Sequence, residues 1–222
     1  MHCEVFPFLQ AGEVDRIVRD LAKRTFADGK STALGRAREV KHNLQVERTG
    51  SERTEIDDIV ATAFTRNRDF QAFAMPSRFV MPIISRYEPG MTYGAHVDNS
   101  LMGGFNGLRT DLAMTIFLTP PASYDGGELV IHEPAGEEEI KLDCGEAIVY
   151  PATSVHHVAP VTRGVRLAAV TWIQSAVHDE RVRAILYDLS HALIQAEKEK
   201  NHSMTLLLSK SYHNLVRYAA EP

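Results

Sequence analysis

The chain has 222 residues, 44% of them hydrophobic, which is enough to bury a full core and most simply indicates one domain with peripheral additions. Its formal net charge of -5 gives no reason to expect a polyanionic partner, so nucleic acid is disfavoured. The sequence has no apolar run long enough to cross a bilayer and no basic signal-peptide start, and Cys3 and Cys144 form no disulfide framework, so we expect a cytoplasmic protein without membrane contacts.

The first part of the chain predicts helices around a short strand. Apolar residues recur at helical spacing twice, as in Val14-Ile17-Leu21 and in Ile56-Ile59. In chain order we expect a helix over residues 12–27, a polar loop over 28–39, a strand over 42–46, and a helix over 54–73 that breaks near Asn67. Residues 1–77 are therefore interpreted as an N-terminal support region of helices and a strand.

Short β-rich runs separated by Pro, Gly and Asp follow. The expected strands are 79–87, 93–98, 111–118, 128–132, 139–142, 147–150, 154–160 and 166–174. Strand-sized runs with turn signals between them are typical of a jelly-roll sandwich or barrel, so we predict a mainly β chain with its core in residues 78–176. The acidic run 137–139 is interpreted as an exposed turn.

The helical pattern returns after this core. Val182, Ile185 and Leu189 form one apolar stripe, and a second helix is expected from Ser203, a suitable N-cap, to about Tyr218. Residues 177–222 are therefore predicted to be a C-terminal helical extension. Its apolar stripe fits either packing on the barrel or a homodimer.

A candidate metal site lies in the predicted strand 93–98. His96 and Asp98 are two residues apart, so on a strand their side chains share one face and can bind a single ion. An imidazole and a carboxylate are two of the three ligands in the facial triad of non-heme Fe(II) oxygenases, which leaves coordination positions open for O2 and substrate. A second histidine is then required.

His156 and His157 are the candidates, and strand alternation lets only one of them face inward. We select His156 because Arg166 follows ten residues later, on what is expected to be the next strand. A guanidinium offers a fork of donors that matches a carboxylate, so an Arg opposite a metal is suited to a dicarboxylic acid. This describes 2-oxoglutarate, whose keto-acid end can chelate iron while its distal carboxylate pairs with Arg166.

Three segments carry a resemblance to a known family: RYEPGMTYGAHVD at 86–98, DGGEL at 125–129 and YPATSVHHVAPVTRGVR at 150–166. Together they resemble the Fe(II)/2-oxoglutarate dioxygenases of the prolyl-hydroxylase type. The whole length, including the helical tail, is similar to the bacterial PKHD-type hydroxylases associated with iron uptake.

The resemblance implies a double-stranded β-helix (jelly-roll, cupin-like) core and a hydroxylase that consumes O2 and 2-oxoglutarate and releases succinate and CO2. It implies that His96, Asp98 and His156 hold iron, that Arg166 binds 2-oxoglutarate, and that L-ascorbate supports activity. Tyr87 matches a family tyrosine that can hydrogen-bond the cosubstrate. Related prolyl hydroxylases carry a tyrosine where this chain has Phe117, which leaves Thr115 as the candidate for a second donor to the distal carboxylate.

The substrate is not readable from these residues. The prolyl-hydroxylase likeness suggests an amino acid or a peptide, and the iron-uptake association equally allows a siderophore-like molecule. The loop from Asn99 to Thr110 and the residues before Val40 are Gly-rich or polar, and are placed where lids that select the substrate could reach the iron.

Two other functions use the same residues. A non-catalytic jelly-roll sensor of iron or 2-oxoglutarate could lose any of the three ligands or Arg166, whereas this chain keeps them all. A zinc hydrolase on the same ligands would leave Arg166 without a role and lacks a Glu general base beside His96-Val97-Asp98. The dioxygenase is therefore the preferred hypothesis.

Overall fold

The computed structural model of the protein describes residues 3–48, 53–103 and 107–221. The strands are β1 Glu4–Pro7, β2 Phe26–Asp28, β3 Lys41–His42, β4 Leu44–Val46, β5 Pro76–Phe79, β6 Ile83–Tyr87, β7 Thr92–His96, β8 Leu101–Met102, β9 Leu108–Arg109, β10 Leu112–Phe117, β11 Asp125–Gly126, β12 Leu129–Glu133, β13 Gly136–Ile140, β14 Glu146–Pro151, β15 His156–Val158, β16 Val161–Arg163 and β17 Arg166–Ser175. The α-helices are α1 Ala11–Leu21, α2 Gly35–Glu39, α3 Glu55–Arg66, α4 Arg68–Ala74, α5 Glu180–Lys198 and α6 His202–Ala219.

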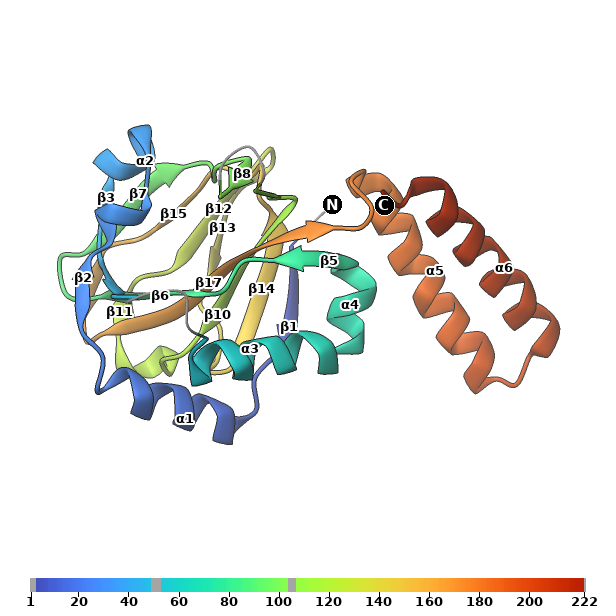
Figure 1. Ribbon diagram of the computed structural model, residues 1–222, viewed down its shortest axis with the longest axis horizontal. Helices are drawn as coiled ribbons and strands as arrows, with labels where there is room; N and C mark the ends of the chain where they lie inside the picture. Colours follow the sequence, from blue (N-terminus) through green and yellow to red (C-terminus); the bar gives the residue numbers. More distant parts are fainter. Residues whose placement is uncertain (1–2, 49–52, 104–106, 222) are drawn as a thin grey trace.

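Two antiparallel sheets form the centre of the molecule (Figure 1). The larger sheet has the order β1-β14-β10-β17-β6-β4-β2, with β5 paired to β17, and the smaller has the order β13-β12-β15-β7-β3. One apolar cluster combines side chains of both sheets and so lies between them. This arrangement confirms the predicted jelly-roll core with flanking helices.

Strand β10, with the sequence LAMTIF, shows how the core is divided in two. Every one of its residues is buried, because the strand is covered on both faces. Leu112, Met114 and Ile116 pack in the cluster that the N-terminal helices cover, whereas Ala113 and Phe117 pack in the cluster between the sheets. Strand alternation thus directs one set of residues to the helices and the other toward the interior of the barrel.

Helices α1, α3 and α4 lie along the outer face of the larger sheet (Figure 1). Thr54 begins α3 in a capping box with Asp57, and the Asn67 side chain accepts a hydrogen bond from the backbone N–H of Phe70 to begin α4. The predicted break near Asn67 is therefore confirmed. The rings of Phe64 and Phe70 meet edge to face across this break, with centroids 5.0 Å apart.

The C-terminal helices form a hairpin that projects from the barrel (Figure 1). Its attachment is on α5, where the buried Arg183 guanidinium donates to the carbonyl oxygen of Val177 at 2.8 Å and Tyr187 meets Phe73 of α4 edge to face. No residue of α6 is buried. None of the helices in the described part of the chain is long and apolar enough to span a membrane.

Three predicted boundaries in the N-terminal half are wrong. The helix expected over 12–27 ends at Leu21, because Phe26–Asp28 pairs with β4 in the larger sheet. The expected loop 28–39 contains a 3-10 turn at Gly29–Thr32 and the short helix α2. The expected strand 42–46 is two strands that join different sheets, with Asn43 between them.

Three further boundaries differ beyond residue 78. The strand expected over 79–87 is interrupted between Phe79 and Ile83, where Pro82 cannot donate a ladder hydrogen bond. The acidic run 137–139 is not a turn but lies within edge strand β13, where all three residues are exposed. Helix α6 begins at His202 and is capped by Asn201 rather than by Ser203. The division at residues 77 and 176 stays a prediction.

Candidate metal centre and cosubstrate pocket

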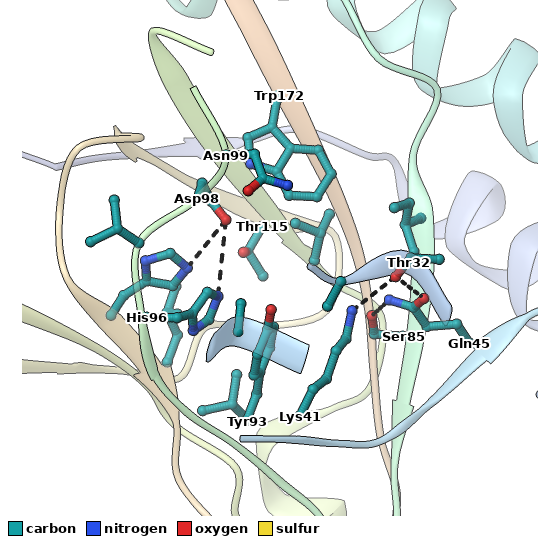
Figure 2. A pocket seen from close by; sticks show the side chains of 18 of the residues that line it. Thr32, Lys41, Gln45, Ser85, Tyr93, His96, Asp98, Asn99, Thr115 and Trp172 are labelled. Atoms are coloured by element: carbon teal, nitrogen blue, oxygen red, sulfur yellow. Dashed lines mark hydrogen bonds and ion pairs between the residues drawn. The ribbon is translucent and has the colours of Figure 1, made fainter. Parts of the chain in front are cut away.

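Three predicted ligands converge at one end of the barrel. His96 is the last residue of β7, Asp98 follows just beyond the strand rather than on it, and His156 opens β15 directly opposite His96. The Nε2 atoms of both histidines lie 3.9 Å from Oδ1 of Asp98 (Figure 2). Within the described ranges, no other His, Cys, Asp or Glu group brings three such donor atoms within 4.8 Å of one another.

Both imidazoles are oriented by their own backbone. Nδ1 of His96 lies 2.9 Å from the carbonyl oxygen of Gly94, and Nδ1 of His156 lies 3.1 Å from that of Ser154. A carbonyl can only accept, so each Nδ1 must carry the proton and donate it. The lone pair of each Nε2 therefore points toward the Asp98 carboxylate, as a metal ligand requires.

His157 faces away from this centre. Its Nδ1 lies 3.0 Å from Nε2 of His132 on the neighbouring strand β12. The choice of His156 over His157, made because Arg166 follows ten residues later, agrees with the side to which each ring points.

Buried polar atoms at the centre lack partners. Oδ2 of Asp98 and Nε1 of Trp172 have no hydrogen-bond partner among the described residues. Burial raises the pKa of Asp98, and the neighbouring His156 partly offsets this rise. Burial, together with His156, lowers the pKa of His96 to about 3, so its ring is neutral at pH 7. Two imidazoles and an unsatisfied carboxylate fit a divalent cation.

Arg166 begins β17 and is 1% exposed. Its guanidinium lies over the rings of Tyr87 and Phe117, at 5.2 Å and 5.3 Å from their centroids, and its Nε has no hydrogen-bond partner. No carboxylate of the described residues forms an ion pair with it. Burying a charge without a counter-ion is costly, so this side chain is suited to an anion brought by a ligand.

The DGGEL turn holds Arg166 in place. Gly126 and Gly127 both adopt positive φ, at 70° and 69°, a region that favours glycine. A Cβ on Gly127 would lie 3.0 Å from Cδ of Arg166, and one on Gly126 would lie 2.0 Å from the carbonyl oxygen of Pro160. The glycine pair therefore permits the close approach of this turn to the arginine stem.

One cavity connects the three converging donors with Arg166. It encloses about 740 Å³ including its open mouth. His96, Asp98, His156 and Arg166 all line it. Trp172, Val170 and Arg166 alternate along β17, and all three line the cavity as expected of one strand face.

Segments predicted as lids border the cavity. Asn99 and Met102 line it from one side, and Leu34 and Ala37 of the α2 segment line it from the other. Residues 104–106 of the expected lid loop lie outside the described residues. Leu34 is 69% exposed, so this edge of the cavity offers an apolar surface to solvent.

Sequence reasoning missed Lys41 and Tyr150, which also line the cavity. Tyr150 is 1% exposed, and burial raises its pKa well above the ordinary value. The alternation of side chains along β14 places Tyr150 inward, and this alternation could have been read from the sequence. Lys41 gave no such signal, because β3 has only two residues and its pairing with β7 is not readable from the sequence.

Comparison with known families places this fold and donor set in one class of protein. Residues 82–174 match the family model of the 2OG-Fe(II) oxygenase superfamily. The matched segment contains the three converging ligands and Arg166.

Full-length relatives narrow the class further. A PKHD-type hydroxylase of Paracoccus denitrificans (strain Pd 1222) is 42% identical over 221 residues, covering 97% of each chain. A second, from Rippkaea orientalis (strain PCC 8801 / RF-1), is 41% identical over 210 residues, covering 94% of this chain and 95% of the relative. This chain belongs to the PKHD-type hydroxylases, and it is thus a hydroxylase of the Fe(II)/2-oxoglutarate-dependent dioxygenases.

A solved structure shares the fold at low identity. The viral collagen prolyl hydroxylase of Paramecium Bursaria Chlorella virus-1, described as a 2OG complex, superposes with a TM-score of 0.55 at 19% identity. The match covers 79% of this chain and 97% of the viral chain. It supports the jelly-roll assignment independently of the sequence relatives.

Proposed function

We propose that this protein binds Fe(II) through His96, Asp98 and His156 and hydroxylates an amino-acid, peptide or siderophore-like substrate, converting 2-oxoglutarate and O2 to succinate and CO2. The observation that carries the proposal is a buried guanidinium with no ion-pair partner in the described residues, facing the same cavity as a converged pair of imidazoles and a carboxylate. The bound metal would supply the activation of O2.

The side chains of this protein would bind, orient and exclude water. Arg166 pairs with the distal carboxylate of 2-oxoglutarate. The ring of the buried Tyr87 packs against the Arg166 guanidinium and holds it in place. Thr115 also lines the cavity and is the proposed second donor to that carboxylate. Trp172, which lies close to Asp98 in Figure 2, forms the wall that shields the centre from water.

The two adjacent histidines provide a matched test of the ligand assignment. His156→Ala should lower Fe(II) affinity by more than about a hundredfold, because it removes one of three donors, whereas second-sphere changes alone cost 10–100-fold. His157→Ala should bind Fe(II) as the wild type does, because its ring bonds to His132 outside the cavity. Anaerobic equilibrium dialysis measures both, and iron loss in His157→Ala alone would reverse the assignment.

The activity is tested by adding Fe(II) and 2-oxoglutarate to the protein without O2 and following the metal-to-ligand absorption of the chelate. O2 and L-ascorbate are then admitted, and succinate is measured with and without a panel of amino acids, peptides and siderophores. Succinate release stimulated by a panel member is expected. A chelate that never yields succinate with any of them would favour the sensor, and no chelate would contradict both functions.

We further propose a homodimer through the C-terminal hairpin. Leu206 and Leu207 of α6 are 71% and 59% exposed, although both are large apolar side chains. The variant carrying Leu206→Glu and Leu207→Glu should sediment as a monomer while the wild type sediments as a dimer. Lys210→Glu, on the same helix, serves as the charge control, and a monomeric wild type would contradict the proposal.

We also propose that the protein works in the cytoplasm. Cys3 and Cys144 are both free thiols, as expected in a reducing compartment that keeps iron ferrous.

A further inference from the structure

Lys41 is a buried cation with no role in the site proposed so far. It lies on β3, is 5% exposed, and lines the same cavity as His96 and Arg166. Figure 2 shows its side chain beside Tyr93, with the ammonium 5.0 Å from the centroid of that ring. The Tyr93 ring in turn stacks on the His96 ring at 3.7 Å. The ring of Tyr93 therefore lies between the ammonium and the imidazole of His96.

The charge of Lys41 is not neutralised by the protein. Among residues 3–48, 53–103 and 107–221, no carboxylate lies within ion-pair distance of its Nζ. Asp98 and Asp28 act on it only from further away, and burial lowers its pKa to about 8. An ammonium has three N–H donors, and the structure gives only one hydrogen bond for it, to Oγ1 of Thr32 at 3.0 Å.

Neutral groups hold the ammonium in position. Oγ1 of Thr32 also lies 2.6 Å from Oε1 of Gln45, which can only accept, so the hydroxyl donates there and accepts from Lys41. The Gln45 amide in turn donates to Oγ of Ser85 at 3.4 Å (Figure 2). The chain thus positions a buried positive charge and leaves it available, which is the arrangement of a binding site for an anion.

The cosubstrate does not account for this second cation. In the proposed function, one carboxylate of 2-oxoglutarate binds the metal and the other pairs with Arg166, so 2-oxoglutarate has no carboxylate left to pair with Lys41. Arg166 also lies on the larger sheet, whereas Lys41 lies on the edge strand of the smaller one. The two cations are therefore held by different walls of the cavity.

We propose that Lys41 binds a carboxylate of the molecule to be hydroxylated, so that the substrate is a carboxylic acid: a free amino acid or the C-terminal residue of a peptide. This inference rests on the proposed function and deepens it. The carboxylate would sit beside Tyr93, and the C–H bond to be oxidised would lie a few bonds from it, toward His96. Neutral siderophores and internal peptide segments lack the group that Lys41 requires.

The test uses the intact protein with Fe(II) and 2-oxoglutarate, kept free of O2. Binding of a carboxylate panel (acetate, free L-amino acids, N-acetyl-L-proline and a peptide with a free C-terminus) is measured by calorimetry and compared with the matching amides. We expect at least one carboxylate to bind about tenfold to a hundredfold more tightly than its amide, the range of a charge-assisted hydrogen bond. Free amino acids and the peptide distinguish the two sources of the carboxylate.

Variants then localise the effect. Lys41→Met should abolish the preference for carboxylates, and Lys210→Met, which removes the same charge from α6, should keep it. With O2, panel members that stimulate succinate release should be acids rather than amides. The comparison of carboxylates with amides uses the wild-type protein alone, so it tests the inference even if Lys41→Met fails to fold.

The inference would be overturned if no carboxylate binds, if amides bind as well as acids, or if Lys41→Met keeps the preference. A Lys41→Met protein that loses affinity for 2-oxoglutarate instead would place Lys41 in the cosubstrate site and also overturn it. Failure of the wild type to form the Fe(II)–2-oxoglutarate chelate would be seen before any panel member is added, and would count against the proposed function itself.

Discussion

Asp98→Ala is expected to abolish iron binding, with an Fe(II) affinity more than about a hundredfold below the wild type. The substitution removes the only carboxylate among the three converging donors and leaves the two imidazoles, of which that of His96 is neutral. Because the buried Oδ2 of Asp98 has no partner in the described structure, its removal should not lower the melting temperature of the metal-free protein. Anaerobic dialysis and thermal unfolding measure the two effects.

Asp188→Ala, at an exposed position of α5, provides the control for loss of one negative charge. It should bind iron as the wild type does. An Asp98→Ala protein that still retains one Fe(II) per chain would show that the three donors are not the metal site.

Arg166→Met is expected to weaken 2-oxoglutarate binding by about 2–5 kcal/mol, the cost of removing one partner of a buried charge pair. Iron binding should survive, since the guanidinium is not part of the donor group. The anaerobic absorption of the Fe(II)–2-oxoglutarate chelate, titrated with the cosubstrate, gives the affinity directly.

Arg163→Met is the matched control for this change. Arg163 lies three residues earlier and forms an exposed ion pair with Asp125, which contributes little. Its loss should leave the titration unchanged. Equal affinity of Arg166→Met and the wild type for 2-oxoglutarate would remove Arg166 from the cosubstrate site.

The main features of the site were accessible from the sequence because they depend on short-range geometry. The spacing of His96 and Asp98 placed two donors together even though Asp98 lies past the end of its strand. Strand alternation allowed only one of His156 and His157 to face inward, and the spacing to Arg166 selected His156. Arg166 does line the same cavity, although strand β16 rather than a simple turn lies between β15 and β17. These inferences needed only the period of a strand and short spacings along the chain.

Features that depend on pairing between distant segments were not accessible. Lys41 enters the cavity because β3 pairs with β7, about fifty residues further along the chain, and Gly94 permits the close approach, since a Cβ there would lie 2.8 Å from Cβ of Val40. Helix periodicity also extended falsely to Phe26, since an apolar residue at a helical position serves equally well in a strand. Such choices are made by tertiary contacts rather than by local pattern.

The backbone hydrogen bonds that orient His96 and His156 have a consequence for metal identity. The protein itself orients both rings, and the three converging donors include no thiolate. Intrinsic affinities of such nitrogen and oxygen donors rise from iron through cobalt and nickel to copper, with zinc also above iron. If these donors hold the metal as proposed, they do not by themselves select iron over cobalt, nickel or zinc. We therefore expect these metals to occupy the site and inactivate the protein when ferrous iron is scarce.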